Sequence, residues 1–477
     1  MKHIVKSAFF ITLGGALPLL ASVILLIPYT ENLHTADYGA LAIYISFSLL
    51  VQILMNYGVD SYLAVHYYDH KDDPSALRRF LGEITGGLLV YSVLLMTILC
   101  LLSWITFPYI FPDGNISFWP YGFMSILTGF FNAWFRMYVN VQIYADKPRK
   151  YFWFGLFNLI VTVGISTWLV YANPFTLIGP MWGRMLSGVL IFLLTFGYGL
   201  REYGIRLNPA HWKPVKAYST PIVVFSLLTW VLGYINNYIL NALATPADVG
   251  VYDFATKATI LLEYLAIGVL GAITPRVFQL WKKDGANATL PEESRYYHAY
   301  SAVNVLAIAV LILLLPFVVK VFIHNEAYHV SIQYMPLLCL SFVFRPLQGL
   351  LLNPIYFQKK TQILPKQLVV TASVQIVSTC VFVLWFGVWG AVWGIALAKF
   401  IQIIILYRSV KPFYRLGINT LKMIYLPLIY FLVVMTLGFS GIEQKTTGVV
   451  QLILACCLVI SVYRKEVQLI PAMLRGK

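Results

Sequence analysis

Charged residues are scarce in this sequence. Only 11% of its 477 residues are Asp, Glu, Lys or Arg, whereas soluble globular domains contain roughly 25%. Hydrophobic residues make up 60% of the chain. Apolar runs long enough to cross a bilayer as helices, about 18 residues or more, recur from residue 8 to residue 463. The composition therefore argues against a soluble protein and indicates an integral membrane protein.

The sequence also lacks the patterns of common metal, redox and catalytic sites. Its cysteines all lie in apolar runs and show neither metal-ligand spacing nor a disulfide framework; they are Cys100, Cys339, Cys380, Cys456 and Cys457. The patterns Gly-x-x-x-x-Gly-Lys-[Ser/Thr], His-Glu-x-x-His and Gly-x-Ser-x-Gly are absent. We therefore expect no metal, no cofactor and no ATPase, and we interpret the chain as a transporter rather than an enzyme.

The apolar runs do not alternate with a period of two residues, as barrel strands would. Because backbone polar groups cannot remain unpaired in lipid, helices are the expected spanning elements. The sequence predicts an all-α integral membrane protein with about 14 transmembrane helices. The predicted spans are 8–29, 40–66, 80–108, 118–144, 151–172, 177–199, 219–243, 251–275, 298–322, 331–357, 366–386, 388–407, 421–439 and 447–463.

The net charge of +15 reflects an uneven distribution of Lys and Arg among the loops. Nearly all basic residues in the loops and at the ends of the predicted helices lie on one face, with the two termini and alternate loops, and the opposite face has only Lys320 and Lys445. The positive-inside rule then places both termini in the cytoplasm. This pattern explains the basic charge without a nucleic-acid partner.

Two short motifs occur twice at the same spacing. Residues 35–39 (TADYG) and 246–250 (PADVG) each precede a predicted helix, and residues 179–183 (GPMWG) and 390–394 (GAVWG) each open one. The repeat predicts two pseudo-symmetric six-helix lobes, 1–210 and 211–415, followed by two additional helices and a cytoplasmic tail in 416–477. Because each half would start in the cytoplasm, the repeats are parallel, as in transporters that hold substrate between two halves.

A small set of charges lies within the predicted helices. A charge in the bilayer costs about 2.5–3.5 kcal/mol on insertion scales, so such residues normally face a cavity or a partner. The cations are Arg136, Arg184, Lys257, Arg345 and Lys399, and the acidic candidates for coupling or ion pairing are Glu263, Asp253 and Asp60. Their cationic surplus suits an anionic substrate, and we expect a cationic cleft between the lobes. Each of these residues could instead have only a structural role.

Several segments resemble the motifs of bacterial polysaccharide flippases. They are TADYG at 35–39, ADKP at 145–148, VKAYSTP at 215–221 and VGVYDFATK at 249–257. Their order and spacing extend over about residues 1–465. The chain is thus similar to the O-antigen and capsule branch of the multidrug/oligosaccharidyl-lipid/polysaccharide exporter superfamily. Lys257 matches a motif position, whereas Asn236 and Asn237 stand where relatives often carry an Asp-Arg pair.

The resemblance implies a two-lobed flippase of the bacterial cytoplasmic membrane. Its substrate would be a polyprenyl-pyrophosphate-linked oligosaccharide, and a polysaccharide polymerase and glycosyltransferases would be possible partners besides the lipid bilayer. One alternative is a multidrug antiporter of the same superfamily, which would take cationic drugs through acidic lobes. Another is a membrane glycan polymerase or ligase, although such enzymes generally carry larger extracytoplasmic loops than those predicted here.

Overall fold

A computed structural model describes residues 2–284, 290–414, 419–440 and 444–467. The chain divides into two compact units, Met1–Gly250 and Val251–Lys477. Within the described residues, 13 helices are long and apolar enough to span a membrane. The predicted all-helical membrane fold is therefore confirmed.

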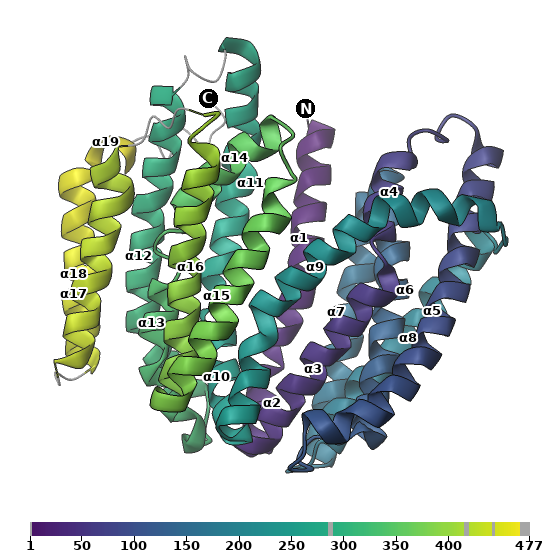
Figure 1. Ribbon diagram of the computed structural model, residues 1–477, viewed down its shortest axis with the longest axis horizontal. Helices are drawn as coiled ribbons and strands as arrows, with labels where there is room; N and C mark the ends of the chain where they lie inside the picture. Colours follow the sequence, from purple (N-terminus) through teal and green to yellow (C-terminus); the bar gives the residue numbers. More distant parts are fainter. Residues whose placement is uncertain (1, 285–289, 415–418, 441–443, 468–477) are drawn as a thin grey trace. The chain divides into compact units, whose positions relative to one another are not determined.

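The first unit is built from α1 to α9 and the start of α10 (Figure 1). The elements are α1 (Lys2–Ile24), α2 (Leu26–Asn32), α3 (Thr35–Asn56), α4 (Val59–His66), α5 (Pro74–Ile110), η1 (Phe118–Gly122), α6 (Phe123–Tyr144), α7 (Pro148–Ala172), α8 (Ile178–Glu202), α9 (Pro209–Leu243) and α10 (Pro246–Thr259). Helix α6 is not among the 13 apolar spans. It packs between α3 and α8 and corresponds to the predicted span 118–144.

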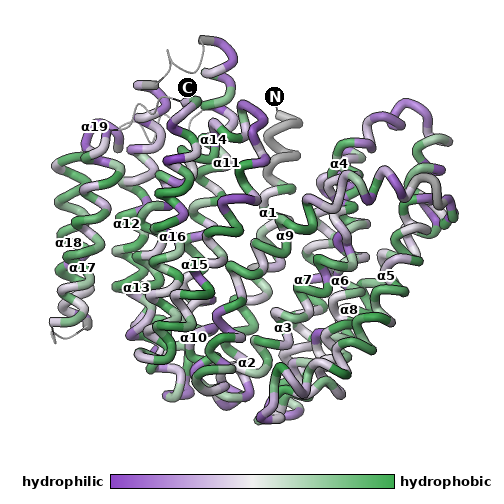
Figure 2. Tube along the Cα trace, in the orientation of Figure 1, coloured by the Kyte–Doolittle hydropathy of each residue, from purple (hydrophilic) through white to green (hydrophobic). Residues whose placement is uncertain are grey.

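The second unit contains the rest of α10 and the remaining elements. They are α11 (Leu261–Asp284), α12 (Leu290–Phe322), η2 (Glu326–Gln333), α13 (Met335–Leu340), α14 (Arg345–Phe357), α15 (Ile363–Phe386), α16 (Val388–Val410), η3 (Leu421–Tyr425), α17 (Leu426–Phe439), α18 (Gln444–Val462) and α19 (Arg464–Val467). Hydrophobic residues predominate along α17 and α18 (Figure 2). This composition suits helices that face lipid.

The helix boundaries follow local signals in the sequence. Helix α5 starts at Pro74, and the Asp73 side chain accepts hydrogen bonds from the backbone of Ser75 at 2.8 Å and Ala76 at 3.2 Å. Such a cap satisfies backbone donors at a helix start, and proline fits the first helical position. Helices α15 and α16 are separated only by Gly387, whose φ of +54° is readily adopted by glycine. The predicted division at this point is correct.

Besides the first span, 8–29, which has a turn at Leu25 between α1 and α2, three predicted spans are interrupted rather than continuous. The span 40–66 breaks at Tyr57 and Gly58, which both have positive φ. A second break, at Ile260, separates α10 from α11, and a third, over residues 341–344, separates α13 from α14. The apolar pattern could not show these breaks, because hydropathy reports the length of a span and not its backbone path.

The repeated glycine motifs have equivalent packing in the two units. In the first, a Cβ added to Gly183 would lie 2.5 Å from the Cα of Ser166 on the preceding helix α7. In the second, a Cβ added to Gly394 would lie 2.3 Å from the Oγ1 of Thr379 on the preceding helix α15. Both motifs therefore allow close packing of a helical hairpin, α7–α8 or α15–α16.

The other repeated motif brings the starts of α3 and α10 into direct backbone contact. A Cβ added to Gly39 would lie 1.9 Å from the carbonyl oxygen of Pro246, and one added to Gly250 would lie 2.0 Å from the carbonyl oxygen of Thr35. The contact is reciprocal, as expected for two related segments. Only residues without a side chain permit this approach.

The contacts of α9 place it with the first unit, because it packs against α3, α4 and α5. The boundary between units thus follows residue 250, whereas the sequence repeat suggested 210. The division into two six-helix lobes at 210 and 415, with additional helices after 415, stays a prediction based on the repeat.

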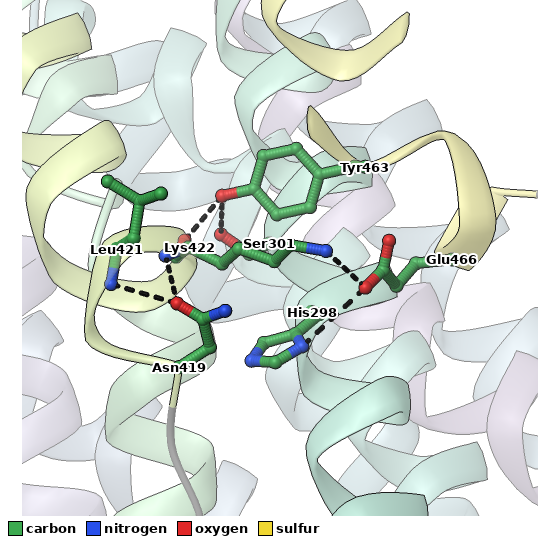
Figure 3. A network of polar contacts seen from close by, with 7 residues as sticks. All are labelled: His298, Ser301, Asn419, Leu421, Lys422, Tyr463 and Glu466. Atoms are coloured by element: carbon green, nitrogen blue, oxygen red, sulfur yellow. Dashed lines mark hydrogen bonds and ion pairs between the residues drawn. The ribbon is translucent and has the colours of Figure 1, made fainter. Parts of the chain in front are cut away.

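A polar network connects the ends of α17 and α18 to α12 (Figure 3). The Lys422 ammonium lies 2.5 Å from a carboxylate oxygen of Glu466, and the same oxygen lies 3.8 Å from Nδ1 of His298 on α12. The Tyr463 hydroxyl donates to the backbone carbonyl of Lys422 and lies 3.5 Å from the hydroxyl of Ser301. Because Glu466 and His298 are both buried, this network ties the ends of α17 and α18 to α12.

We expect Glu466→Ala to destabilise the protein. Removing one partner of a buried ion pair leaves the other charge uncompensated and lowers the free energy of unfolding by about 3–5 kcal/mol. Because Lys422 is partly exposed, we expect a loss near the lower end of this range. The measurement is thermal unfolding in detergent. Lys465→Ala is the matched control, because Lys465 is exposed on the same short helix. Equal melting temperatures for the two variants would contradict the assignment of a stabilising role to the network.

Candidate functional site

The second unit contains a cavity of about 320 Å³. Its walls come from the start of α11, the segment between α13 and α14, one face of α16, and α17. The charged residues among its lining are Glu263, Arg345 and Lys399, all three singled out from the sequence. The volume lies at the lower end of the range for ligand pockets, about 300–1,000 Å³.

One wall of the cavity is an interruption in a membrane helix. Helix α13 ends at Leu340 and α14 begins at Arg345, with Pro346 in its first turn. The Asn304 side-chain amide donates to the carbonyls of Phe342 at 3.0 Å and Val343 at 3.4 Å, which satisfies backbone groups freed by the break. The N-terminal end of α14 therefore borders the cavity. A helix N-terminus favours negative charge because its backbone N–H groups lack partners.

Arg345 is held at this helix start by two side chains. One terminal nitrogen donates to Glu263 on α11, and the other donates to the Gln348 side chain at 2.6 Å. Its Nε–H group is buried and has no hydrogen-bond partner among the described residues. The Arg345 and Glu263 side chains are 24% and 34% exposed, so the pair remains accessible to a ligand.

Lys399 has no carboxylate partner at ion-pair distance among the described residues. Its ammonium donates to the Ser341 hydroxyl at 3.0 Å and lies 3.6 Å from the ring centroid of Phe342. An ammonium has three N–H donors. Because Lys399 makes one hydrogen bond to a neutral acceptor and one cation–π contact, part of its hydrogen-bonding capacity remains available to a ligand. Since Glu263 is already paired with Arg345, the cavity retains one uncompensated positive charge.

A chain of glutamines extends from Arg345 across three helices. The Gln348 amide nitrogen donates to Gln402 on α16 at 3.2 Å, and the Gln402 amide nitrogen donates to Gln367 on α15 at 3.2 Å. Gln348 and Gln402 line the cavity. Amide groups both donate and accept hydrogen bonds, so this face can bind hydroxyl groups as well as orient Arg345.

The remaining walls of the cavity are aromatic and aliphatic. Phe344, Trp393 and Phe400 line it, together with Leu428 and Phe431 from α17. The cavity therefore combines two cations, one carboxylate and two amides with apolar surfaces. This combination is suited to an amphipathic anionic ligand.

Arg136 and Asp60 form an ion pair in the first unit. The Nε of Arg136 lies 2.7 Å from the Asp60 carboxylate, whose other oxygen accepts from Asn56 at 3.1 Å. The Asp60 side chain is 10% exposed, whereas that of Arg136 is 57% exposed. Arg136 is thus neutralised by Asp60 on one side and open on the other.

The two other predicted cations are placed differently. Lys257 pairs with Asp253 one turn earlier on α10, at 2.6 Å, and is not part of the cavity lining. Arg184 lies near the buried hydroxyl of Tyr29 in the first unit. Of the five cations, the structure therefore brings Arg345 and Lys399 together in one cavity, and Glu263 joins them as the partner of Arg345.

Sequence reasoning missed the helix break and the glutamine chain. The signals were present: Pro346 follows Arg345 within an apolar span, and the three glutamines lie in predominantly apolar helices. A residue before proline is biased away from the helical region. Polar residues in a span normally face protein rather than lipid. Their convergence on one cavity, however, depends on the helix packing.

Comparisons with known proteins agree on a transporter fold. The family described as "Polysaccharide biosynthesis protein" matches residues 4–281. The structure is similar to that of "Lipid II flippase MurJ, inward closed conformation", with a TM-score of 0.70 and 15% identity over 97% of this chain and 99% of the other. Searched against curated proteins, the sequence finds no match.

A second group of similar structures consists of multidrug transporters. An inward-facing "multidrug resistance MATE family transporter of the MOP superfamily" has a TM-score of 0.63 and 14% identity, over 82% of this chain and 97% of the other. A MATE crystal structure in complex with MaL6 has a TM-score of 0.57 and 14% identity, over 86% and 95% of the two chains. At these identities the similarity defines the fold and leaves the substrate open.

Proposed function

The chain belongs to the family of polysaccharide biosynthesis proteins, and from this premise we propose that it is a flippase for a polyprenyl-pyrophosphate-linked oligosaccharide. It would carry an O-antigen, capsule or exopolysaccharide repeat unit across the bacterial cytoplasmic membrane by alternating access. In this proposal both termini are cytoplasmic, and a polymerase and glycosyltransferases are the partners that use and supply the glycan.

The single observation that carries the proposal is the cavity with Arg345 and Lys399 at a broken membrane helix. A pyrophosphate loses its hydration in the membrane interior, and cations with charge-assisted hydrogen bonds offset that loss. Arg345 would bind the pyrophosphate through its fork of N–H donors, and Lys399 would add a second charge. The start of α14 would contribute backbone dipoles to the same site.

The other cavity residues have complementary roles in this proposal. Gln348 and Gln402 would bind sugar hydroxyls, and Phe344 or Trp393 would pack against a sugar ring or the first lipid carbons. A volume of about 320 Å³ admits only part of so large a substrate, so the rest would lie outside this cavity. Glu263 would hold Arg345 in place between substrates, and its protonation or displacement would release the arginine.

A role in the substrate pathway stays a prediction for the three other cations, Arg136, Lys257 and Arg184. Arg136 is the strongest of them, because its guanidinium is 57% exposed while one side is held by Asp60. Lys257 is paired with Asp253, and Arg184 lies near the Tyr29 hydroxyl, so both would act mainly by setting local structure. Pairing with a fixed carboxylate makes Arg136 and Lys257 weaker as substrate ligands than Lys399.

A multidrug antiporter is the competing function, since transporters of that class share the fold. A cationic drug would need an acidic group free to bind it. Among the described residues that line the cavity, Glu263 is the sole carboxylate; it is paired with Arg345, and Lys399 would repel a cation. These charges favour an anionic substrate.

The proposal is tested in a strain that lacks the gene. We expect surface polysaccharide to disappear, and the lipid-linked oligosaccharide to accumulate where a membrane-impermeant glycan-modifying reagent added to spheroplasts cannot reach it. Expression of the wild-type chain should restore both accessibility and surface polysaccharide. Normal surface polysaccharide in the deletion strain, combined with increased sensitivity to cationic drugs, would instead establish the antiporter.

A further inference from the structure

Glu293 is a buried carboxyl group that the proposed transport site does not use. It lies in the first turn of α12 and is 2% exposed. One of its oxygens, Oε2, accepts hydrogen bonds from the Tyr414 hydroxyl at 2.5 Å and from the Trp281 indole at 3.3 Å. The other oxygen, Oε1, is buried and has no hydrogen-bond partner among the described residues.

The groups that face Glu293 from neighbouring elements are neutral. Trp281 comes from α11, and Tyr414 from the segment after α16. Burial raises the pKa of Tyr414, so its hydroxyl stays protonated and serves as a donor. Tyr297, one turn along α12, receives a hydrogen bond from Asn353 on α14 at 2.5 Å.

The charged groups of the same region are engaged elsewhere or exposed. His298 and Lys422 both contact Glu466, and Arg276 is close to Tyr296. The remaining cations of α11 and α12 are exposed: Lys282, Lys283, Arg295 and Lys320. Within the described residues, no Lys, Arg or His lies at ion-pair distance from Glu293.

An ionised Glu293 would therefore be a buried anion with two neutral donors on one oxygen and none on the other. Burial of a charge without a counterion is far less favourable than burial of the neutral acid. The start of α12 attracts negative charge only weakly. The neutral acid, with its proton on Oε1, is consequently the stable form in this environment.

We propose that Glu293 is a proton-binding site, occupied while the side chain is buried between Trp281 and Tyr414. The proton is taken from water and is returned to water when this contact opens, leaving a carboxylate that the bulk solvent stabilises. No other reactant is needed. Opening of the contact between α11, α12 and Tyr414 therefore favours loss of the proton, and loss of the proton favours opening of the contact.

The position of Glu293 connects this protonation with the helices of the cavity. Helix α11 carries Glu263, and Tyr414 follows α16, which carries Lys399. Trp281 also packs edge-on against Phe357 of α14, with ring centroids 5.0 Å apart, and Arg345 begins that helix. Proton binding would thus favour the arrangement in which these helices are packed together. This link to transport rests on the proposed function, whereas the proton site itself does not.

Infrared difference spectroscopy of the purified full-length chain in lipid tests the site directly. Comparison of wild type with Glu293→Gln should show the loss of one protonated-carboxyl band that is present at neutral pH, well above the ordinary glutamate pKa of about 4.3. Glu292→Gln is the matched control, because Glu292 is the exposed neighbour of Glu293 on the same helix. The Glu292 variant should keep the band.

A second variant keeps the measurement informative if Glu293→Gln does not fold. Tyr414→Phe retains the acid and removes a hydrogen bond to its Oε2, so the band should remain and move to higher frequency. The proton site would be overturned by an unchanged spectrum in both variants. It would also be overturned if Glu293→Gln lost the band of an ionised carboxylate instead of the band of a protonated carboxyl group. Loss of export by either variant concerns only the link to transport, and the spectra are independent of it.

Discussion

Arg345→Ala should reduce export of the lipid-linked oligosaccharide by about 10- to 100-fold. Hydrogen bonds to charged groups contribute about 1.5–3 kcal/mol, and each 1.4 kcal/mol corresponds to a factor of about ten. Arg345 also joins Glu263 to Gln348 at the start of α14, so its loss disturbs the cavity at its centre. Export is measured as surface polysaccharide restored in the deletion strain, at matched amounts of protein in the membrane.

A structural role of Arg345 can be separated from a role in binding substrate. In the single variant, Glu263 is left without its partner, and this alone could impair the protein. The double variant Glu263→Gln, Arg345→Ala removes both charges. If Arg345 serves only to neutralise Glu263, the double variant should recover export. We expect that it does not, because a ligand for the pyrophosphate is still missing.

A further comparison addresses the general effect of losing a positive charge. Arg295 on α12 is exposed and does not line the cavity, so Arg295→Ala should export normally. Equal export by the two single variants would remove Arg345 from the proposed pathway. Lys399→Ala should then be examined first, since Lys399 is the other cation of the cavity.

Gly39→Ala and Gly250→Ala should each impair export, by about 5- to 100-fold. An added Cβ would lie 1.9 Å from the carbonyl oxygen of Pro246 in the first case and 2.0 Å from that of Thr35 in the second. These atoms are backbone and cannot rotate away, so the starts of α3 and α10 must separate. Overpacking of this kind costs about 1–3 kcal/mol, enough to disfavour the contact by a factor of about 5 to 100.

The glycine contact is tested with export and thermal stability together. Gly164 on α7 and Gly233 on α9 have open space where a Cβ would stand, and alanine at either position should leave both properties unchanged. If alternating access requires the α3–α10 contact to form in each cycle, export should fall in the Gly39 and Gly250 variants even where the protein remains folded. Normal export by either variant would show that the contact is dispensable.

The sequence by itself determined the class of the molecule and most of its helices. A bilayer of about 30 Å demands roughly 20 apolar residues for each crossing, so composition and run length were enough to locate the spans. The division between α15 and α16 was also correct, because Gly387 separates two long apolar runs. Charges within such runs are costly, so the positions of Arg345, Lys399 and Glu263 in the sequence were enough to make them candidates.

Only the tertiary structure decided which of these residues meet. Sequence spacing assigns residues to the same face of one helix, but it does not state how that helix is rotated and displaced against others. The packing of the helices pairs Glu263 with Arg345, whereas Lys399 donates to Ser341. The break before α14, the glutamine chain and the buried Glu293 also depend on contacts between helices distant in sequence. Such contacts follow from side-chain packing, which hydropathy does not encode.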